Sequence, residues 1–138
     1  MKTILLPVDF SSSTHLLYEK TLELAKAFHS QVYLIHVVLP NENCDNASAE
    51  EVGSEFADES VAINQLANQL RDQDVETHAL LLEGVASQRI LDEARRLDAD
   101  LIVLGSHGHG AILGVLMGDV SQSVLKEATC PVLIVPTR

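Results

Sequence analysis

Five short runs of aliphatic residues constrain the fold of this chain more than any other feature. They are Ile4–Val8, Val32–Val38, His78–Leu82, Leu101–Leu104 and Val132–Val135. Continuous apolar runs of this length are typical of strands that are buried on both faces, as in parallel sheets. Parallel neighbours need a crossover of about a dozen residues or more, and every gap between these runs is long enough to hold one. The runs therefore predict five strands of a mostly parallel sheet.

Helical periodicity fills the gaps between these runs. Apolar residues recur at helical spacing in three segments, at Leu17, Thr21, Leu24 and Phe28, at Phe56, Ile63, Leu66 and Leu70, and at Ile90, Ala94 and Leu97. We expect Ser11, Ser12 and Ser13 to supply N-cap oxygens for the first helix, and the polar stretches 71–74 and 97–100 to end the other two. The alternation of strand and helix predicts an open α/β domain.

Charged residues on the third of these helices are expected to be solvated. They are Asp92, Glu93, Arg95 and Arg96, and such a group is usually an exposed helix face.

Length and charge exclude several classes of protein. A chain of 138 residues predicts one domain over residues 1–138. Its 9 Lys and Arg against 20 Asp and Glu give a net charge of 9 − 20 = −11, which argues against nucleic acid or an anionic membrane as a partner. We find neither a signal-peptide core nor an apolar stretch of the roughly 18 residues that span a bilayer, and we expect a cytoplasmic protein.

Five of the seven glycines fall within fourteen residues directly after the fourth apolar run. They are Gly105, Gly108, Gly110, Gly114 and Gly118. Glycines let backbone N–H groups converge on an anion, and a helix predicted from about Asp119 to Glu127 would add the partial positive charge of its N-terminus. The segment predicts a phosphate cradle, with a connection that merely packs over the sheet as the alternative.

Three familiar motifs do not fit this segment. Ala111 and Ile112 stand where a Walker loop needs Lys and Ser or Thr, and Gly114 comes one residue late for a dinucleotide fingerprint. His107 and His109 have no third His or Cys nearby in the sequence, so we expect no dedicated metal site. No nucleophile-elbow pattern surrounds Ser106, which leaves serine hydrolysis without support.

Motifs at both ends of the chain resemble those of the universal stress protein family. Gly105-Ser106-His107-Gly108, followed after nine residues by Gly118, is similar to the family signature, and Cys130–Pro136 to its terminal strand. Ile4–Ser11 resembles its first strand and the Val-Asp-x-Ser turn. The resemblance implies a Rossmann-like five-stranded parallel sheet of order 3-2-1-4-5 with helices on both faces. It also implies a homodimer, and the apolar edge strand Val132–Val135 suits such pairing.

The resemblance also implies an adenine-nucleotide site, position by position. Pro7, Val8 and Asp9 would line an adenine and ribose pocket together with Val38. The ribose and phosphate contacts would come from Leu104, Gly105, His107, Gly108, Gly118, Asp119, Val120 and Ser121. From the residues alone, Asp9 is as well suited to cap the following helix as to contact a ligand.

Asp119 departs from the pattern, because the family's nucleotide-binding members have Ser or Thr after the last motif glycine. A carboxylate can only accept hydrogen bonds, and it repels a phosphate by about 1 kcal/mol or more at contact distance. Asp119 could also cap its helix through the amides of Ser121 or Gln122.

Two functions remain open. One is a stress-response protein that binds ATP or a smaller adenine ligand, with or without Mg²⁺, and without rapid turnover. The other is a nucleotide-independent dimeric interaction module in which Asp119 blocks the phosphate site. Slow phosphohydrolysis has the least support, because no Lys or Arg lies between Gly105 and Val124.

Overall fold

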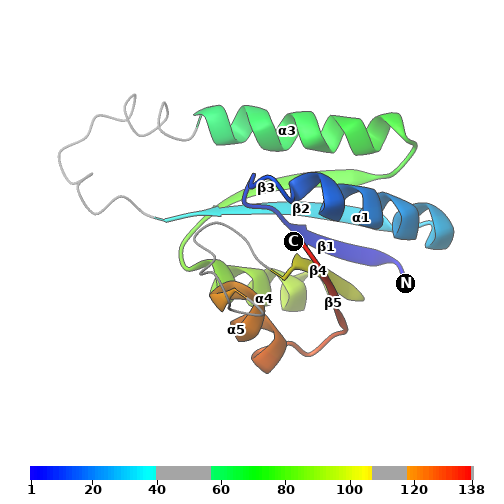
Figure 1. Cartoon of the computed structure of the whole chain (residues 1–138). Helices are drawn as coiled ribbons and strands as arrows, with labels where there is room; N and C mark the ends of the chain where they lie inside the picture. Colours follow the sequence, from blue (N-terminus) through cyan, green and yellow to red (C-terminus); the bar gives the residue numbers. More distant parts are fainter. Residues whose placement is uncertain (40–56, 107–117, 138) are drawn as a thin grey trace.

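Strands and helices alternate along the chain, as the apolar runs predict (Figure 1). The computed structural model describes residues 1–39, 57–106 and 118–137. Its elements are β1 (Thr3–Pro7), α1 (Thr14–Phe28), β2 (Gln31–Val38), α3 (Ala57–Asp72), β3 (Thr77–Glu83), α4 (Ala86–Arg96), β4 (Leu101–Gly105), α5 (Asp119–Glu127) and β5 (Val132–Val135). In these ranges no helix is long and apolar enough to cross a membrane.

The five strands form one parallel sheet of order β3-β2-β1-β4-β5. β1 pairs with β2 in the register Thr3↔Gln31, and with β4 in the register Ile4↔Leu101. The predicted fold class and strand order are therefore confirmed. β1 lies at the centre of the sheet, and the chain moves from it first toward β3 and then back toward β5.

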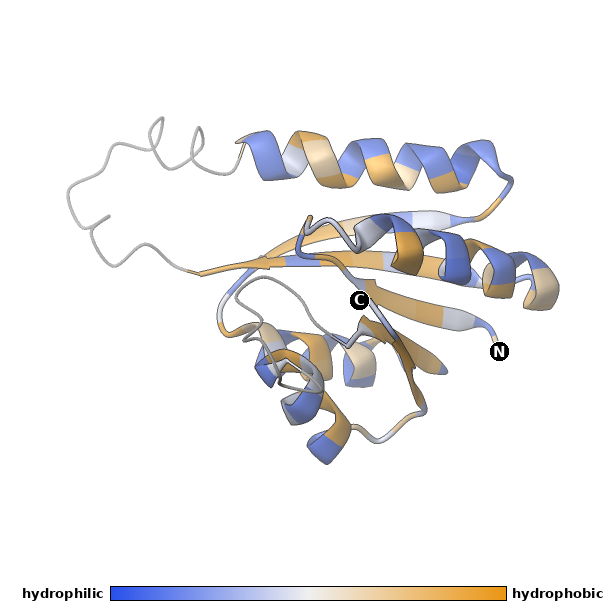
Figure 2. Ribbon diagram, viewed as in Figure 1, coloured by the Kyte–Doolittle hydropathy of each residue, from blue (hydrophilic) through white to orange (hydrophobic). Residues whose placement is uncertain are grey.

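Each face of the sheet is covered by its own pair of helices. Figure 1 shows α1 and α3 on one side and α4 and α5 on the other, and Figure 2 shows that the strands are largely apolar and that apolar and hydrophilic residues alternate along the helices. The core between the sheet and α1 and α3 includes Leu6, Leu34 and Leu70, and the core beneath α4 and α5 includes Ile35 and Ile102. Alternate residues of each central strand thus serve the two cores.

The buried stripe of α1 differs from the predicted one at its end. Leu17, Thr21 and Ala25 are buried, whereas Phe28 is 52% exposed. Phe28 is the last residue of the helix, where the chain turns into β2.

Three helices end in the same way, on a residue with left-handed backbone that is not glycine. The residues are His29, Asp74 and Asp98, with φ of 54°, 65° and 51°. In each case the next N–H reaches back five residues, as in Ser30 to Ala25 at 2.9 Å, which is the long hydrogen bond of a Schellman motif. Asp74 and Asp98 fall in the polar stretches that were expected to end helices.

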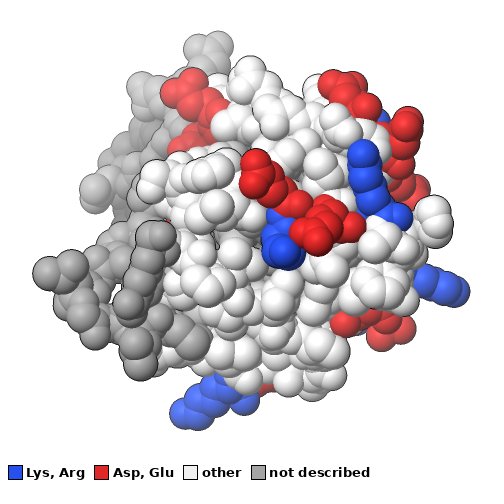
Figure 3. Space-filling model, turned by 45° about the vertical axis from the view of Figure 1, so that its right-hand side comes forward, with Lys and Arg blue, Asp and Glu red and all other residues white. Residues whose placement is uncertain are grey.

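The charged group on α4 is not fully solvated, contrary to the sequence-based expectation. Glu93 is only 6% exposed, and its carboxylate pairs with Arg96 at 2.6 Å and with Arg89 at 3.6 Å. Two flanking guanidinium groups offset the cost of burying this carboxylate. On the face seen in Figure 3, basic side chains are scattered and several lie next to acidic ones.

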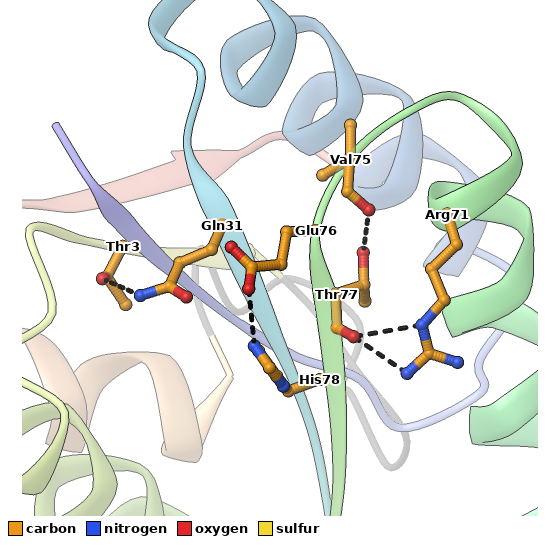
Figure 4. A network of polar contacts seen from close by, with 7 residues as sticks. All are labelled: Thr3, Gln31, Arg71, Val75, Glu76, Thr77 and His78. Atoms are coloured by element: carbon orange, nitrogen blue, oxygen red, sulfur yellow. Dashed lines mark hydrogen bonds and ion pairs between the residues drawn. The ribbon is translucent and has the colours of Figure 1, made fainter.

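Polar contacts join the amino ends of the strands to one another (Figure 4). The Gln31 side-chain amide donates to the Thr3 hydroxyl at 3.0 Å, which connects β2 to β1. The Arg71 guanidinium at the end of α3 donates twice to the Thr77 carbonyl, at 2.8 and 3.1 Å, at the start of β3.

Asp100, just before β4, fixes the first strand at the same edge of the sheet. Its carboxylate accepts hydrogen bonds from the N–H groups of Lys2 at 2.8 Å and Thr3 at 3.0 Å. These bonds, that of Thr3 foremost, hold the pKa of Asp100 below its ordinary value.

The left-handed end of α1 generates the first prediction. His29→Gly should raise the free energy of unfolding by about 0.5–1 kcal/mol. The reason is that a left-handed backbone strains any residue that has a Cβ but does not strain glycine. His29→Ala is the matched control and should bring no such gain, since alanine keeps the Cβ. Urea denaturation of the three proteins measures the difference. Equal stability of the glycine and alanine variants would contradict this account of the turn.

A second prediction concerns pH. Because the pKa of Asp100 is lower in the folded chain than in the unfolded one, its ionised form stabilises the fold above the unfolded pKa of about 3.9. That contribution is lost as pH falls through the folded pKa. Asp100→Asn should therefore be less stable than the wild type at pH 7, with the difference closing below about pH 4. Denaturation curves from pH 7 to 3 test this, and a difference that stays constant would disprove the link to ionisation.

Candidate functional site

The carboxyl ends of β1 and β4 lie side by side at the point where the strand order reverses. These strands pair directly, and the chain leaves β1 for α1 on one face and β4 for α5 on the other. In open α/β sheets, ligands bind at such a switch point outside the carboxyl ends of the strands. The topology therefore brings together two of the segments in which site residues were predicted.

The first segment comprises Pro7, Val8 and Asp9. Pro7 ends β1, and the buried Val8 extends the pairing by donating its N–H to the Ile35 carbonyl at 2.8 Å. Asp9 Oδ1 accepts the N–H of Ser11 at 3.0 Å, which closes an Asx turn. The backbone of Pro7 and Val8 is thus fixed to β2 before the chain turns.

Capping of α1 is only partly as expected, because the N-cap residue is one of the predicted serines but Asp9 does not occupy that position. The helix starts at Thr14, and its N-cap Ser13 makes no side-chain capping bond. Ser13 and Ser11 instead pair through their hydroxyls at 2.9 Å. Asp9 lies four residues before Ser13, and its carboxylate binds the Ser11 N–H in the turn that precedes the helix.

Val38 lies at the carboxyl end of β2, next to β1 in the sheet. Its side chain is 9% exposed, and its carbonyl accepts the N–H of Gly84 at 3.0 Å. The structure therefore places Val38 on the same edge of the sheet as the β1 turn.

The second segment begins at Leu104 and Gly105, which end β4. Leu104 is buried and pairs with Ile134, and Gly105 pairs with Val135. The Gly105 carbonyl accepts the hydroxyl of Ser121 at 2.7 Å. This bond joins the end of β4 to the first turn of α5, and it uses the only hydrogen that the Ser121 hydroxyl could donate to a phosphate.

Ser106 connects three parts of the chain at this point. Its N–H donates to Val135 at 2.9 Å, and its carbonyl accepts the N–H of Gly118 at 2.8 Å. Its hydroxyl oxygen accepts the N–H of Thr137 at 3.1 Å. The residues on either side of the glycine segment, Ser106 and Gly118, are therefore bound to each other, and Ser106 is also bound to the end of β5 and to Thr137 after it.

Asp119 is the first residue of α5 and is exposed to solvent. The N-cap is Gly118, which corrects the expectation that Asp119 caps the helix through Ser121 or Gln122. The Gln122 N–H donates to the Gly118 carbonyl at 3.0 Å as the first helical bond. The carboxylate of Asp119 thus lies where a helix N-terminus favours negative charge, and Val120 beside it is 39% exposed.

Two predicted contact residues, His107 and Gly108, lie outside the described residues, as does His109. Within the described ranges, no group of three His, Cys, Asp or Glu side chains is placed to hold a metal ion. None of the residues predicted to form the site is a Lys or an Arg.

A cavity of about 370 Å³ opens at the opposite end of the strands, where β2 and β3 begin. It lies between the end of α1, at Lys26 and His29, and the connection from α3 to β3, at Asp74 and Glu76. None of the predicted contact residues lines it. It faces the amino ends of the strands, away from the switch point.

Sequence reasoning missed Ser106 and Thr137 as organising residues. They are 31 positions apart, and no local pattern signals that β5 returns the chain to the end of β4. A polar residue directly after a predicted central strand was the one available signal for Ser106.

Comparison with known proteins identifies relatives over nearly the whole length of the chain. The family model described as "Universal stress protein family" matches residues 1–136. Universal stress protein MJ0531 of Methanocaldococcus jannaschii is 32% identical, and the alignment covers 97% of this chain and 81% of that protein.

Solved structures match the fold as well. The structure of hypothetical protein MJ0577, also from M. jannaschii, superposes with a TM-score of 0.88 at 25% identity, over 99% of this chain and 96% of that one. A universal stress protein in complex with cAMP gives 0.77 at 20% identity, covering 99% and 98% of the two chains. One from Archaeoglobus fulgidus in complex with dAMP gives 0.73 at 20% identity, covering 97% of each. With the family model matched over almost every residue and the strand order in agreement, this chain belongs to the universal stress protein family.

Proposed function

We propose that this chain is a cytoplasmic stress-response protein that binds an adenine nucleotide, or a smaller adenine ligand, at the carboxyl ends of β1 and β4. The observation that supports this most is the convergence of Pro7–Asp9 with Gly105 and Gly118–Ser121 on one edge of the sheet. The structural neighbours that hold cAMP and dAMP favour the same class of ligand.

Base and ribose recognition would come from the β1 side of this site. Val8 and Val38 are buried apolar residues at the strand ends, and apolar walls suit the faces of a purine. The Asp9 carboxylate can accept hydrogen bonds from ribose hydroxyls while it holds the turn through the Ser11 N–H.

Phosphate recognition would come from the α5 side and would be weak. The N-terminus of α5 attracts an anion, but the exposed Asp119 occupies its first position. With no Lys or Arg among the site residues, a divalent ion that arrives with the nucleotide could bridge Asp119 and the phosphates. The same lack of cations and of an assigned catalytic base favours binding without rapid turnover.

The alternative function is a nucleotide-independent interaction module. The position of Asp119 at the start of α5 favours it, since a carboxylate there satisfies the helix N-terminus without a ligand. Both functions accommodate a homodimer, so the two differ in the ligand and not in the assembly.

Replacing Asp119 distinguishes these functions. Asp119→Ser should tighten ATP by about fivefold or more and leave adenosine nearly unchanged, because only the phosphates meet the carboxylate and its repulsion is about 1 kcal/mol. Glu127→Gln at the other end of α5 is the matched control, since it removes one negative charge from the same helix. Titration calorimetry with both ligands gives the affinities. Unchanged or weaker ATP binding in Asp119→Ser, or no adenine ligand bound by any of the proteins, would contradict the proposal.

The assembly can be tested separately. β5 is an edge of the described sheet, and all four of its residues are half-buried, so we expect it to pair with β5 of a second copy. Sedimentation at micromolar concentration should give about twice the chain mass of 15.0 kDa. Ile134→Lys should shift the protein to monomer, while Val61→Lys on exposed α3 should not. A monomeric wild type, or a dimeric Ile134→Lys variant, would refute pairing through β5.

A further inference from the structure

His36 contacts the turn after β1 from the neighbouring strand. It lies in β2 on the face that α1 and α3 cover, because side chains alternate and Leu34 belongs to that core. Its ring nitrogen Nδ1 lies 2.7 Å from the Val8 carbonyl oxygen. A carbonyl oxygen can only accept, so Nδ1 carries the hydrogen and donates it. Both backbone groups of Val8 are therefore bound to β2, the N–H to Ile35 and the carbonyl to His36.

The same imidazole supports Phe10 on the other side of Asp9. The two rings lie 4.7 Å apart at an interplanar angle of 55°. Phe10 has a φ of 57°, a left-handed backbone that bulky residues rarely adopt without support from their surroundings. Its side chain also packs against the core beneath α1. Among the described residues, His36 thus joins the core beneath α1 in supporting Phe10 in this conformation.

Asp9 is the residue between these two contacts. The imidazole holds the residue before it by a hydrogen bond and the residue after it by a ring contact, and the Asp9 carboxylate faces the Ser11 N–H at 3.0 Å. We propose that His36 is a positioning residue of the ligand site, which fixes the Val8–Phe10 turn so that Asp9 presents its carboxylate to the ribose. This rests on the function proposed above, and it assigns to a strand residue a role in affinity for the ligand.

Two substitutions separate the hydrogen bond from the packing of the ring. His36→Leu removes both the donor and the ring. His36→Asn retains a donor, because the asparagine side-chain nitrogen can occupy the place of Nδ1. His78→Leu is the matched control, since His78 is a strand histidine that stacks on Tyr33 at 4.6 Å, on β3 and away from the β1 turn.

We expect His36→Leu to weaken adenosine binding on the order of tenfold, the loss typical of one well-placed hydrogen bond. His36→Asn should restore affinity to within about threefold of the wild type, and His78→Leu should leave it unchanged. Titration calorimetry gives these affinities, under conditions where circular dichroism shows each variant to be folded. If His36→Leu binds adenosine like the wild type, or all three variants weaken binding alike, the positioning role is refuted.

A readout without ligand keeps this test apart from that of the proposed function. Amide exchange of the Ser11 N–H reports the bond to Asp9, and it should be faster in His36→Leu than in His36→Asn or His78→Leu. If the wild type binds no adenosine, the proposed function fails, and unchanged Ser11 exchange in His36→Leu then overturns the positioning role as well.

The wild type offers a check that needs no variant. At pH 8 the nitrogen chemical shifts of His36 should show the hydrogen on Nδ1, because the bond to the Val8 carbonyl selects that tautomer. A hydrogen on Nε2 alone would overturn the proposal, even where the leucine variant fails to fold.

Discussion

β1 lies between β2 and β4 in an all-parallel sheet, so its two neighbours must be reached by crossovers in opposite directions. Crossovers between parallel strands are right-handed, which places α1 and α3 on one face and α4 and α5 on the other. The segments that leave β1 and β4 therefore diverge at the carboxyl edge of the sheet. Every other property of the site depends on that divergence, because it exposes backbone and side chains at the centre of an otherwise buried sheet.

The amino and carboxyl ends of the strands differ in how they are held together. At the amino edge, polar groups of neighbouring segments bind one another, as Asp100 binds the N–H groups of Lys2 and Thr3. At the carboxyl edge, the hydrogen bonds of Ser106 and Ser121 close the frame around the glycine segment. In the proposed function, the site would recognise adenine and ribose mainly by shape and hydrogen bonding. Asp9 and Asp119 make the site acidic, and its predicted residues include no Lys or Arg.

Local patterns sufficed to predict the strands and the carboxyl ends of α3 and α4. Each strand lies within a residue of its apolar run, because burial on both faces of a parallel strand leaves a continuous apolar signal. The predicted bounds of α5 are confirmed as well.

The parts that could not be predicted depend on pairings between distant residues. Glu93 reads as a surface charge, because only the packing of α4 against the sheet buries it between Arg89 and Arg96. Ser106 and Thr137 meet only after β5 has paired with β4. The side-chain capping bonds were predicted wrongly because serine hydroxyls and aspartate carboxylates have several local partners, and here Asp9 and Ser13 bind Ser11 instead.

A crystal structure of the protein with adenosine tests the central claim most directly. The account predicts that the base lies against Val8 and Val38 and that the ribose hydroxyls lie within hydrogen-bond distance of Asp9. Adenosine bound instead in the cavity between α1 and the start of β3, or no adenosine at saturating concentration, would contradict it.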